Sequence, residues 1–125
     1  MSTITSSQPA SKLKQLPLLR LAFRPFFLLA ALFSILSLLV WLGFWHGNIL
    51  LRPYGGLVFW HQHEMLFGFA AAVIGGFLLT AVRNWTGLPS LSGGPLLGLV
   101  VLWLLGRVLM AFPMDLPGWL LLAVD

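Results

Sequence analysis

The sequence predicts an all-α protein, a transmembrane helical bundle with three spans and the start of a fourth. The chain has 125 residues, of which 59% are hydrophobic and 8% are charged, and its mean hydropathy is +0.97. Soluble domains carry about 25% charged residues. The apolar residues are also gathered into long runs, three of which approach the ~20 residues that a membrane-spanning helix needs. Lipid is therefore expected to be the main solvent of this chain.

The first span is expected over residues 26–45, which are twenty residues without a charge. As a helix with a rise of ~1.5 Å per residue, this run is about 30 Å long, the thickness of a hydrocarbon core. It exceeds the roughly 7–15 apolar residues of a cleavable signal peptide, so we expect it to be retained. The second and third spans are expected over residues 63–82 and 95–112, and residues 117–125 are expected to start a fourth.

Residues 1–16 are polar and rich in serine and threonine, so we expect a disordered cytoplasmic N-terminus. Residues 17–125 form the expected transmembrane domain. The last apolar run is too short to cross a bilayer, and half a span would leave backbone carbonyls unsatisfied in lipid. We therefore expect these residues to be the N-terminal part of a larger bundle.

The distribution of basic residues predicts the orientation in the membrane. Cytoplasmic loops of membrane proteins are enriched in lysine and arginine. Only Arg52 falls in a loop on the opposite side, so the N-terminus is expected to be cytoplasmic. The same distribution explains the net charge of +4 as a topogenic signal and argues against a nucleic-acid partner. The basic residues assigned to the cytoplasmic side are Lys12, Lys14, Arg20, Arg24 and Arg83.

The segment Trp60–Gly68 is the most informative part of the sequence, because it holds His61, His63 and the only glutamate, Glu64. On a helix, His61 and Glu64 are three residues apart and share a face, while His63 points elsewhere. If residues 60–63 are extended instead, both histidines fall on one side. The spacing thus allows one metal held by both histidines, or two sites that take one histidine each.

Imidazole ligands without thiolate suit copper, haem iron or zinc, and the chain has no cysteine. A neighbouring carboxylate such as Glu64 could orient a ligating ring. The competing interpretation is that His61 and His63 lie at headgroup level and bind nothing. His46 is alone at the end of the first span and is a weaker candidate.

Small residues recur every four positions after Glu64, which is typical of helices that pack closely in lipid. This stripe is expected to face the interior of the bundle, so Glu64 and His61 above it are expected to face protein. It consists of Gly68, Ala72, Gly76 and Thr80.

Arg107 lies within the third span, where an unpaired charge is costly. Consecutive spans joined by a short turn are expected to be antiparallel neighbours. This arrangement brings Arg107 to within about six residues, or ~9 Å along the helix axis, of Glu64. We therefore predict that the guanidinium reaches Glu64 or the adjoining His61. The alternative is that Arg107 extends to the outer headgroups.

Three segments resemble the N-terminal part of the NnrS family. They are LAFRPFFLLAALF at 21–33, WHQHEMLFGFAAAVIGGFLLTAVRNWTG at 60–87 and LWLLGRVLMAF at 102–112. The resemblance covers residues 17–125, and it departs from the family pattern at Arg83, where proline is expected. It implies a bacterial inner-membrane protein with further spans, with haem and copper as cofactors and a role in nitric oxide metabolism.

The function expected from the resemblance is haem and/or copper binding in nitric oxide metabolism or the nitrosative-stress response, with His61 and His63 as candidate ligands. Two other functions remain open. One is a transporter-like bundle with a proton or anion path through Glu64, His61 and Arg107. The other is a non-catalytic scaffold that binds a partner through its small-residue stripe. The expected partners are the lipid bilayer and later spans or another subunit, and the sequence identifies no catalytic residue.

Overall fold

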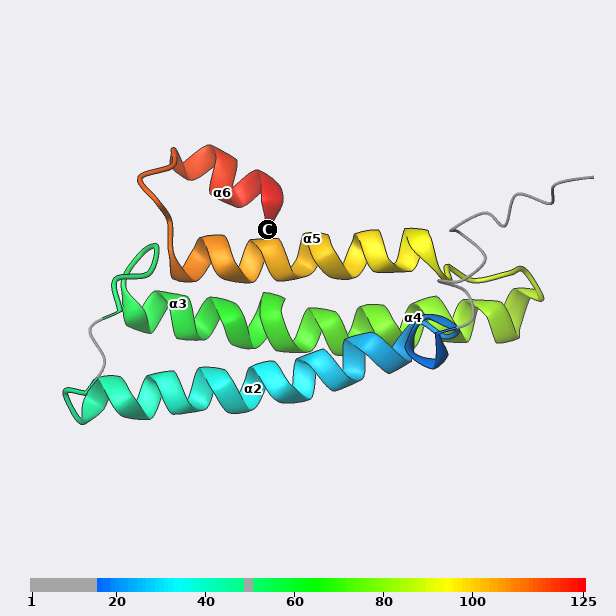
Figure 1. The fold of residues 1–125 in the computed structure, drawn as a ribbon, viewed down its shortest axis with the longest axis horizontal. Coiled ribbons are helices and arrows are strands. Elements are labelled where there is room, and N and C mark those ends of the chain that lie inside the picture. The colour runs from blue at the N-terminus through cyan, green and yellow to red at the C-terminus, as the bar shows by residue number, and fades with distance from the viewer. Residues whose placement is uncertain (1–15, 49–50) are drawn as a thin grey trace, which may run out of the picture.

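The structure is a computed structural model that describes residues 16–48 and 51–125. The disorder expected for residues 1–16 falls almost wholly outside this part. The described residues are helical and contain no strand, and the long helices lie side by side (Figure 1). The elements of the structure, in chain order, are the 3-10 turn η1 (Pro17–Leu19), α2 (Phe23–Trp45), α3 (Leu57–His63), the π-helical segment η2 (Glu64–Ala70), α4 (Ala71–Thr86), α5 (Gly94–Ala111) and α6 (Gly118–Val124).

Three helices are long and apolar enough to cross a membrane: α2 with 23 residues, the continuous helix α3–η2–α4 with 30 residues, and α5 with 18 residues. The prediction of an all-helical bundle with three spans is therefore confirmed. The short helix α6 follows a connection after α5 and folds back onto α5 (Figure 1). It occupies the place of the expected start of a fourth span.

The second long helix runs from Leu57 to Thr86, and it extends beyond the expected 63–82 at both ends. It begins early because Leu57 and Trp60 are buried against Met110 of α5, and this packing continues the helix through residues expected to be loop. It ends at Gly87, whose φ of 71° is left-handed and whose N–H donates to the Arg83 carbonyl. The other two spans begin and end within three residues of their predicted bounds.

A π-helical segment interrupts this long helix at residues 64–70. In a π-helix the backbone hydrogen bonds run from i to i+5, so one extra residue is accommodated per turn. Such segments are rare and occur frequently at functional sites. Here the segment begins at Glu64, which is completely buried.

The stripe of small residues packs against α2. A side chain on Gly76 would place its Cβ 2.9 Å from the Phe26 Cβ and 3.3 Å from the Phe23 Cα. Thr80 Oγ1 accepts a hydrogen bond from the Phe23 N–H at 3.1 Å, which fixes the first turn of α2 against α4. Ala72, in the same stripe, is 2% exposed. The stripe therefore makes the α2–α4 contact within the chain itself.

Replacing Gly76 with valine is expected to destabilise the bundle by ~1–3 kcal/mol, because overpacking a close helix contact forces the backbones apart. Gly75 is the matched control, since a Cβ there meets nothing within 4 Å. Unfolding in mixed detergent micelles, followed by far-ultraviolet circular dichroism, compares the two variants. Equal losses for Gly76→Val and Gly75→Val would show that the stripe does not make the contact.

Candidate functional site

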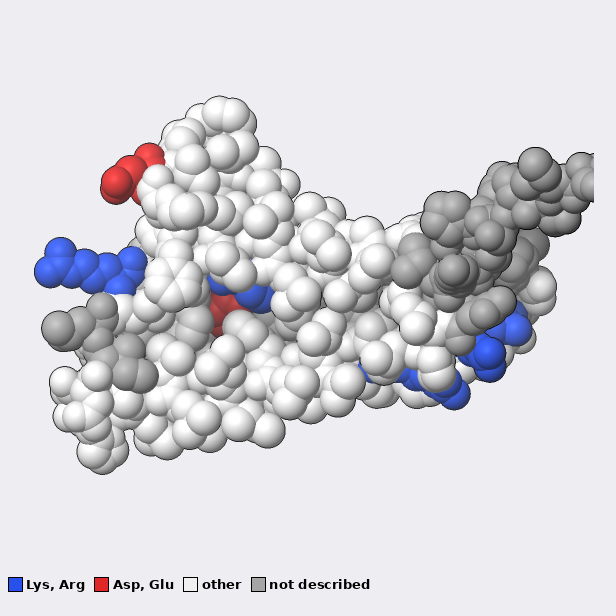
Figure 2. Space-filling view, in the orientation of Figure 1, with Lys and Arg blue, Asp and Glu red and all other residues white. Residues whose placement is uncertain are grey.

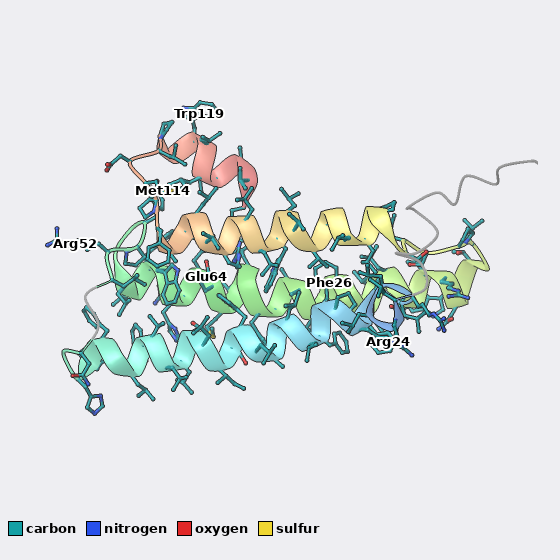
Figure 3. All side chains as sticks on the ribbon, in the orientation of Figure 1. Arg24, Phe26, Arg52, Glu64, Met114 and Trp119 are labelled. Carbon is teal, nitrogen blue, oxygen red and sulfur yellow. The ribbon has the colours of Figure 1, made fainter. Side chains whose placement is uncertain are left out.

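The site is built around an ion pair between the second and third long helices. Arg107 Nη1 on α5 donates a hydrogen bond to Glu64 Oε2 at the start of η2, with 3.0 Å between the two atoms. Glu64 is 0% exposed and Arg107 is 5% exposed. The structure thus brings together Glu64 and Arg107, which the sequence analysis predicted to be in contact because of their opposite charges and similar depths. Glu64 lies among the long helices (Figure 3), and the space-filling view has a recessed red and blue spot between the two ends of the molecule (Figure 2).

The pair is accommodated because residue 68 is glycine. A Cβ on Gly68 would lie 2.7 Å from Glu64 Oε2 and 3.2 Å from Arg107 Nη1. It would also lie 2.5 Å from the Phe33 ring of α2. The first member of the small-residue stripe therefore has a different task from the others, since it leaves room for the guanidinium.

Asp125 adds a second carboxylate to the pair. Its Oδ1 accepts from Arg107 Nη2, so each terminal nitrogen of the guanidinium contacts a different carboxylate. Asp125 follows α6, whose Leu121 is buried, and this packing carries the carboxylate to the depth of Arg107. The sequence analysis did not identify Asp125 as a site residue. The available signal was an acidic residue directly after an apolar run, at a depth where charges require a partner.

His63 closes the group on the side opposite Arg107. Its Nε2 lies 2.9 Å from Asp125 Oδ2, and its Nδ1 lies 3.5 Å from Glu64 Oε1. The ring is stacked on Phe67, with 4.7 Å between the ring centroids. Each carboxylate thus has one oxygen toward Arg107 and the other toward His63. We call His63, Glu64, Arg107 and Asp125 the ionisable cluster.

His61 lies apart from the ionisable cluster. Its Nδ1 is 3.5 Å from Ser37 Oγ of α2, and its ring is stacked on Trp41 with 4.3 Å between centroids. Helical geometry explains the separation, because His61 is rotated about 60° from Glu64 in one direction and His63 about 100° in the other. The expectation that His61 would accompany Glu64 while His63 pointed elsewhere is therefore wrong.

The alternative of an extended segment at residues 60–63 is also excluded, because these residues belong to α3. The structure does not bring His61 and His63 together for one metal. It leaves the arrangement in which each histidine serves a separate site. His46 takes no part in either group, since it is exposed at the end of α2, where its Nδ1 lies 2.8 Å from the Leu42 carbonyl oxygen.

The ionisable cluster has a formal charge of −1 when the His63 ring is neutral. Glu64 Oε1 and His63 Nδ1 are buried and have no hydrogen-bond partner among the described residues. An uncompensated charge and unpaired polar atoms are both costly in an apolar interior. A cation bound between His63 and the carboxylates would relieve both costs.

The geometry of the donors is compatible with a metal ion. His63, Glu64 and Asp125 each offer one ligand atom, and these atoms lie within 4.8 Å of one another. One imidazole nitrogen and two carboxylate oxygens form a mixed donor set that suits copper(II) or zinc. The guanidinium contacts one oxygen of each carboxylate. Of the other two oxygens, Glu64 Oε1 has no hydrogen-bond partner among the described residues, and Asp125 Oδ2 lies 2.9 Å from His63 Nε2.

Three helices that are long and apolar enough to cross a membrane, with a cluster of histidine, carboxylate and arginine side chains between them, define the class of helical membrane proteins with a polar site. Residues 17–125 match the NnrS protein family. The chain therefore belongs to the NnrS family. No curated protein and no solved structure matches the chain significantly.

Proposed function

We propose that this protein binds copper and/or haem and takes part in nitric oxide metabolism or the nitrosative-stress response. The observation that carries the proposal is the set of three potential ligand atoms from His63, Glu64 and Asp125, which lie close together on side chains that are 9%, 0% and 6% exposed. His63 and Glu64 belong to the second candidate span. Membership of the NnrS family supports the same proposal.

Copper fits the ionisable cluster. The ligands would be His63, Glu64 and Asp125, and Arg107 would keep the total charge low by compensating one carboxylate. The unpaired Glu64 Oε1 and His63 Nδ1 are the atoms expected where a cation binds. Bound copper would supply a one-electron redox centre that can bind a small diatomic molecule. The protein's own part is to hold the ligands rigidly and to exclude water from them.

His61 is the candidate ligand for haem. Its Nδ1 lies 3.5 Å from Ser37 Oγ, and hydrogen bonds of this kind usually orient ligating histidines. Its Nε2 has no hydrogen-bond partner among the described residues, which leaves it available to iron. Stacking on Trp41 restricts rotation of the ring further. Bound haem would supply an iron centre for diatomic ligands.

The proposed location is the bacterial inner membrane, with the N-terminus in the cytoplasm. Arg24 lies at one end of the bundle and Arg52 at the other (Figure 3). Arg20 and Arg83 line one hollow at the end that carries Arg24, and the positive-inside rule assigns this arginine-rich end to the cytoplasm. The proposed partners are the lipid bilayer and later spans of a longer protein or another subunit.

The test is the metal content of the chain purified in mild detergent from cells supplied with copper and haem precursors. We expect a Soret absorption band, copper by elemental analysis, or both, in stoichiometric amounts. The double variant His61→Ala/His63→Ala is the matched control and is expected to lose both signals. Colourless protein without copper under these conditions would contradict the proposal.

The second candidate function is a proton or anion path. The ionisable cluster favours this function because charged residues between membrane-spanning helices commonly mark such paths. The path expected from the sequence runs through Glu64, His61 and Arg107. In the structure, His63 and Asp125 replace His61 as the residues beside Glu64 and Arg107. Transport by reconstituted protein should survive removal of metal by a chelator, whereas a metal function should not. The scaffold hypothesis loses its proposed surface, because the small-residue stripe already packs against α2.

A further inference from the structure

The end of the bundle opposite the ionisable cluster carries a hollow lined by two arginines. Arg20, from the segment between η1 and α2, and Arg83, near the end of α4, face the same space of about 350 Å³. Ser90 and Ser92, from the connection between α4 and α5, also line the hollow, and the Ser90 hydroxyl donates to the Leu79 carbonyl. Both arginines are exposed. The hollow therefore offers positive charge and hydrogen-bond donors, which are the groups that bind phosphate.

This end of the molecule has no acidic side chain to compensate the arginines. The whole sequence contains three acidic residues, and Glu64 and Asp125 are already engaged in the ionisable cluster. Asp115, the third, lies in the connection between α5 and α6, at the other end of α5. Figure 2 shows blue without red at the end where α4 finishes. The positive charge is thus left for a ligand outside the chain.

An apolar groove begins at the same segment that carries Arg20. It has a volume of about 380 Å³ and is lined only by apolar residues. The residues of η1 form one wall, and α2 and α5 form the others through Leu28, Leu29, Leu97 and Leu104. Arg24 Nη1 donates to the Pro17 carbonyl at 2.8 Å, which ties η1 to the first turn of α2. The apolar groove and the charged hollow are therefore lined by consecutive residues of the chain, the groove by residues 16–19 and the hollow by Arg20.

The depth of this element matches the membrane surface. It lies at the end of the long helices, and Trp85 and Leu18 are 70% and 50% exposed there. Exposed tryptophan is typical of the headgroup region. Basic pockets between helices at this depth bind phosphate-bearing headgroups.

We infer that Arg20 and Arg83 hold the phosphate of an anionic phospholipid, with an acyl chain lying in the apolar groove beside η1. The groove favours a lipid over free phosphate, because inorganic phosphate would leave the apolar walls uncovered. The two arginines favour an anionic lipid over a zwitterionic one, because the choline of a zwitterionic headgroup brings a positive charge of its own. This site shares no residue with the ionisable cluster.

The experiment is native mass spectrometry of the full chain released from micelles that contain phosphatidylglycerol and phosphatidylcholine in equal amounts. We expect the chain to retain phosphatidylglycerol preferentially. In Arg20→Gln/Arg83→Gln the preference should fall by roughly 30-fold, since each basic residue near an anionic headgroup contributes about 1 kcal/mol and a tenfold change corresponds to ~1.4 kcal/mol.

Arg52→Gln is the matched control, because Arg52 is exposed at the other end of the molecule (Figure 3), and it should keep the full preference. Arg20→Lys/Arg83→Lys should retain most of the preference, and circular dichroism shows whether each variant is folded. Equal retention of the two lipids by the unmodified chain would overturn the inference, as would an unchanged preference in the glutamine variant. Displacement of the lipid by millimolar inorganic phosphate would assign the site to free phosphate instead.

Discussion

Replacement of Arg107 with methionine is expected to destabilise the bundle by about 3–5 kcal/mol, the usual cost of breaking a buried ion pair by removing one partner. Methionine retains the volume of the arginine stem, so the loss reports charge more than packing. The guanidinium contacts both Glu64 and Asp125, and its removal leaves two carboxylates in an apolar interior. The measurement is unfolding in mixed detergent micelles, followed by circular dichroism.

The double variant Glu64→Gln/Arg107→Met should recover part of the lost stability, because it also removes one of the stranded charges. Arg52→Met is the control for loss of an arginine, and its effect should be close to zero because Arg52 is exposed. If the losses in Glu64→Gln and Arg107→Met simply add in the double variant, the two side chains are not coupled. The ion pair would then make no contribution of its own to the free energy of unfolding.

Substitution of His63 with alanine is expected to lower bound copper by at least tenfold, whereas His61→Ala should lower bound haem and leave copper in place. The reason is geometric: the His63 ring lies beside Asp125 and Glu64, and the His61 ring lies beside Ser37 and Trp41. Loss of a group that merely orients a metal ligand already costs about 10–100-fold in affinity, so loss of a ligand should cost no less.

His46→Ala is the control for removal of an imidazole, since His46 belongs to neither group. Copper is measured by elemental analysis and haem by the Soret band in the same preparations. If His61→Ala removes copper as completely as His63→Ala, the two histidines serve one site and the separation described above is not functional. If neither substitution changes metal content, the ligands lie elsewhere.

The spans could be predicted from the sequence because long apolar runs and basic flanks depend on composition alone. The early start of the second helix at Leu57 could not be predicted from the sequence. Arg52, Pro53 and two glycines precede it and are typical of a loop, whereas the packing of Trp60 against Met110 depends on the third helix. Gly87, by contrast, was available as a helix-ending signal and would have placed the end of α4 correctly.

The Glu64–Arg107 contact could be predicted because the two residues have opposite charges and similar depths along their helices. The hydropathy pattern gives these depths to within a few residues. The identity of the third and fourth members of the cluster depends on rotation about the helix axis. Periodicity does not indicate the π-helical segment. Helical spacing separates His61 from His63, but which of the two accompanies Glu64 could not be decided without the neighbouring helices. Asp125 joins only because α6 folds back onto α5, a contact that short apolar runs do not predict.

The π-helical segment sets an angle as well as a local hydrogen-bond pattern. One additional residue in a helix turns everything beyond it by about 100° about the axis. The imidazoles of α3 lie before residues 64–70, and the glycine and alanine face that meets α2 lies mostly after them. The number of residues in this stretch therefore sets the angle about the helix axis between the histidines of α3 and the small-residue face that packs against α2.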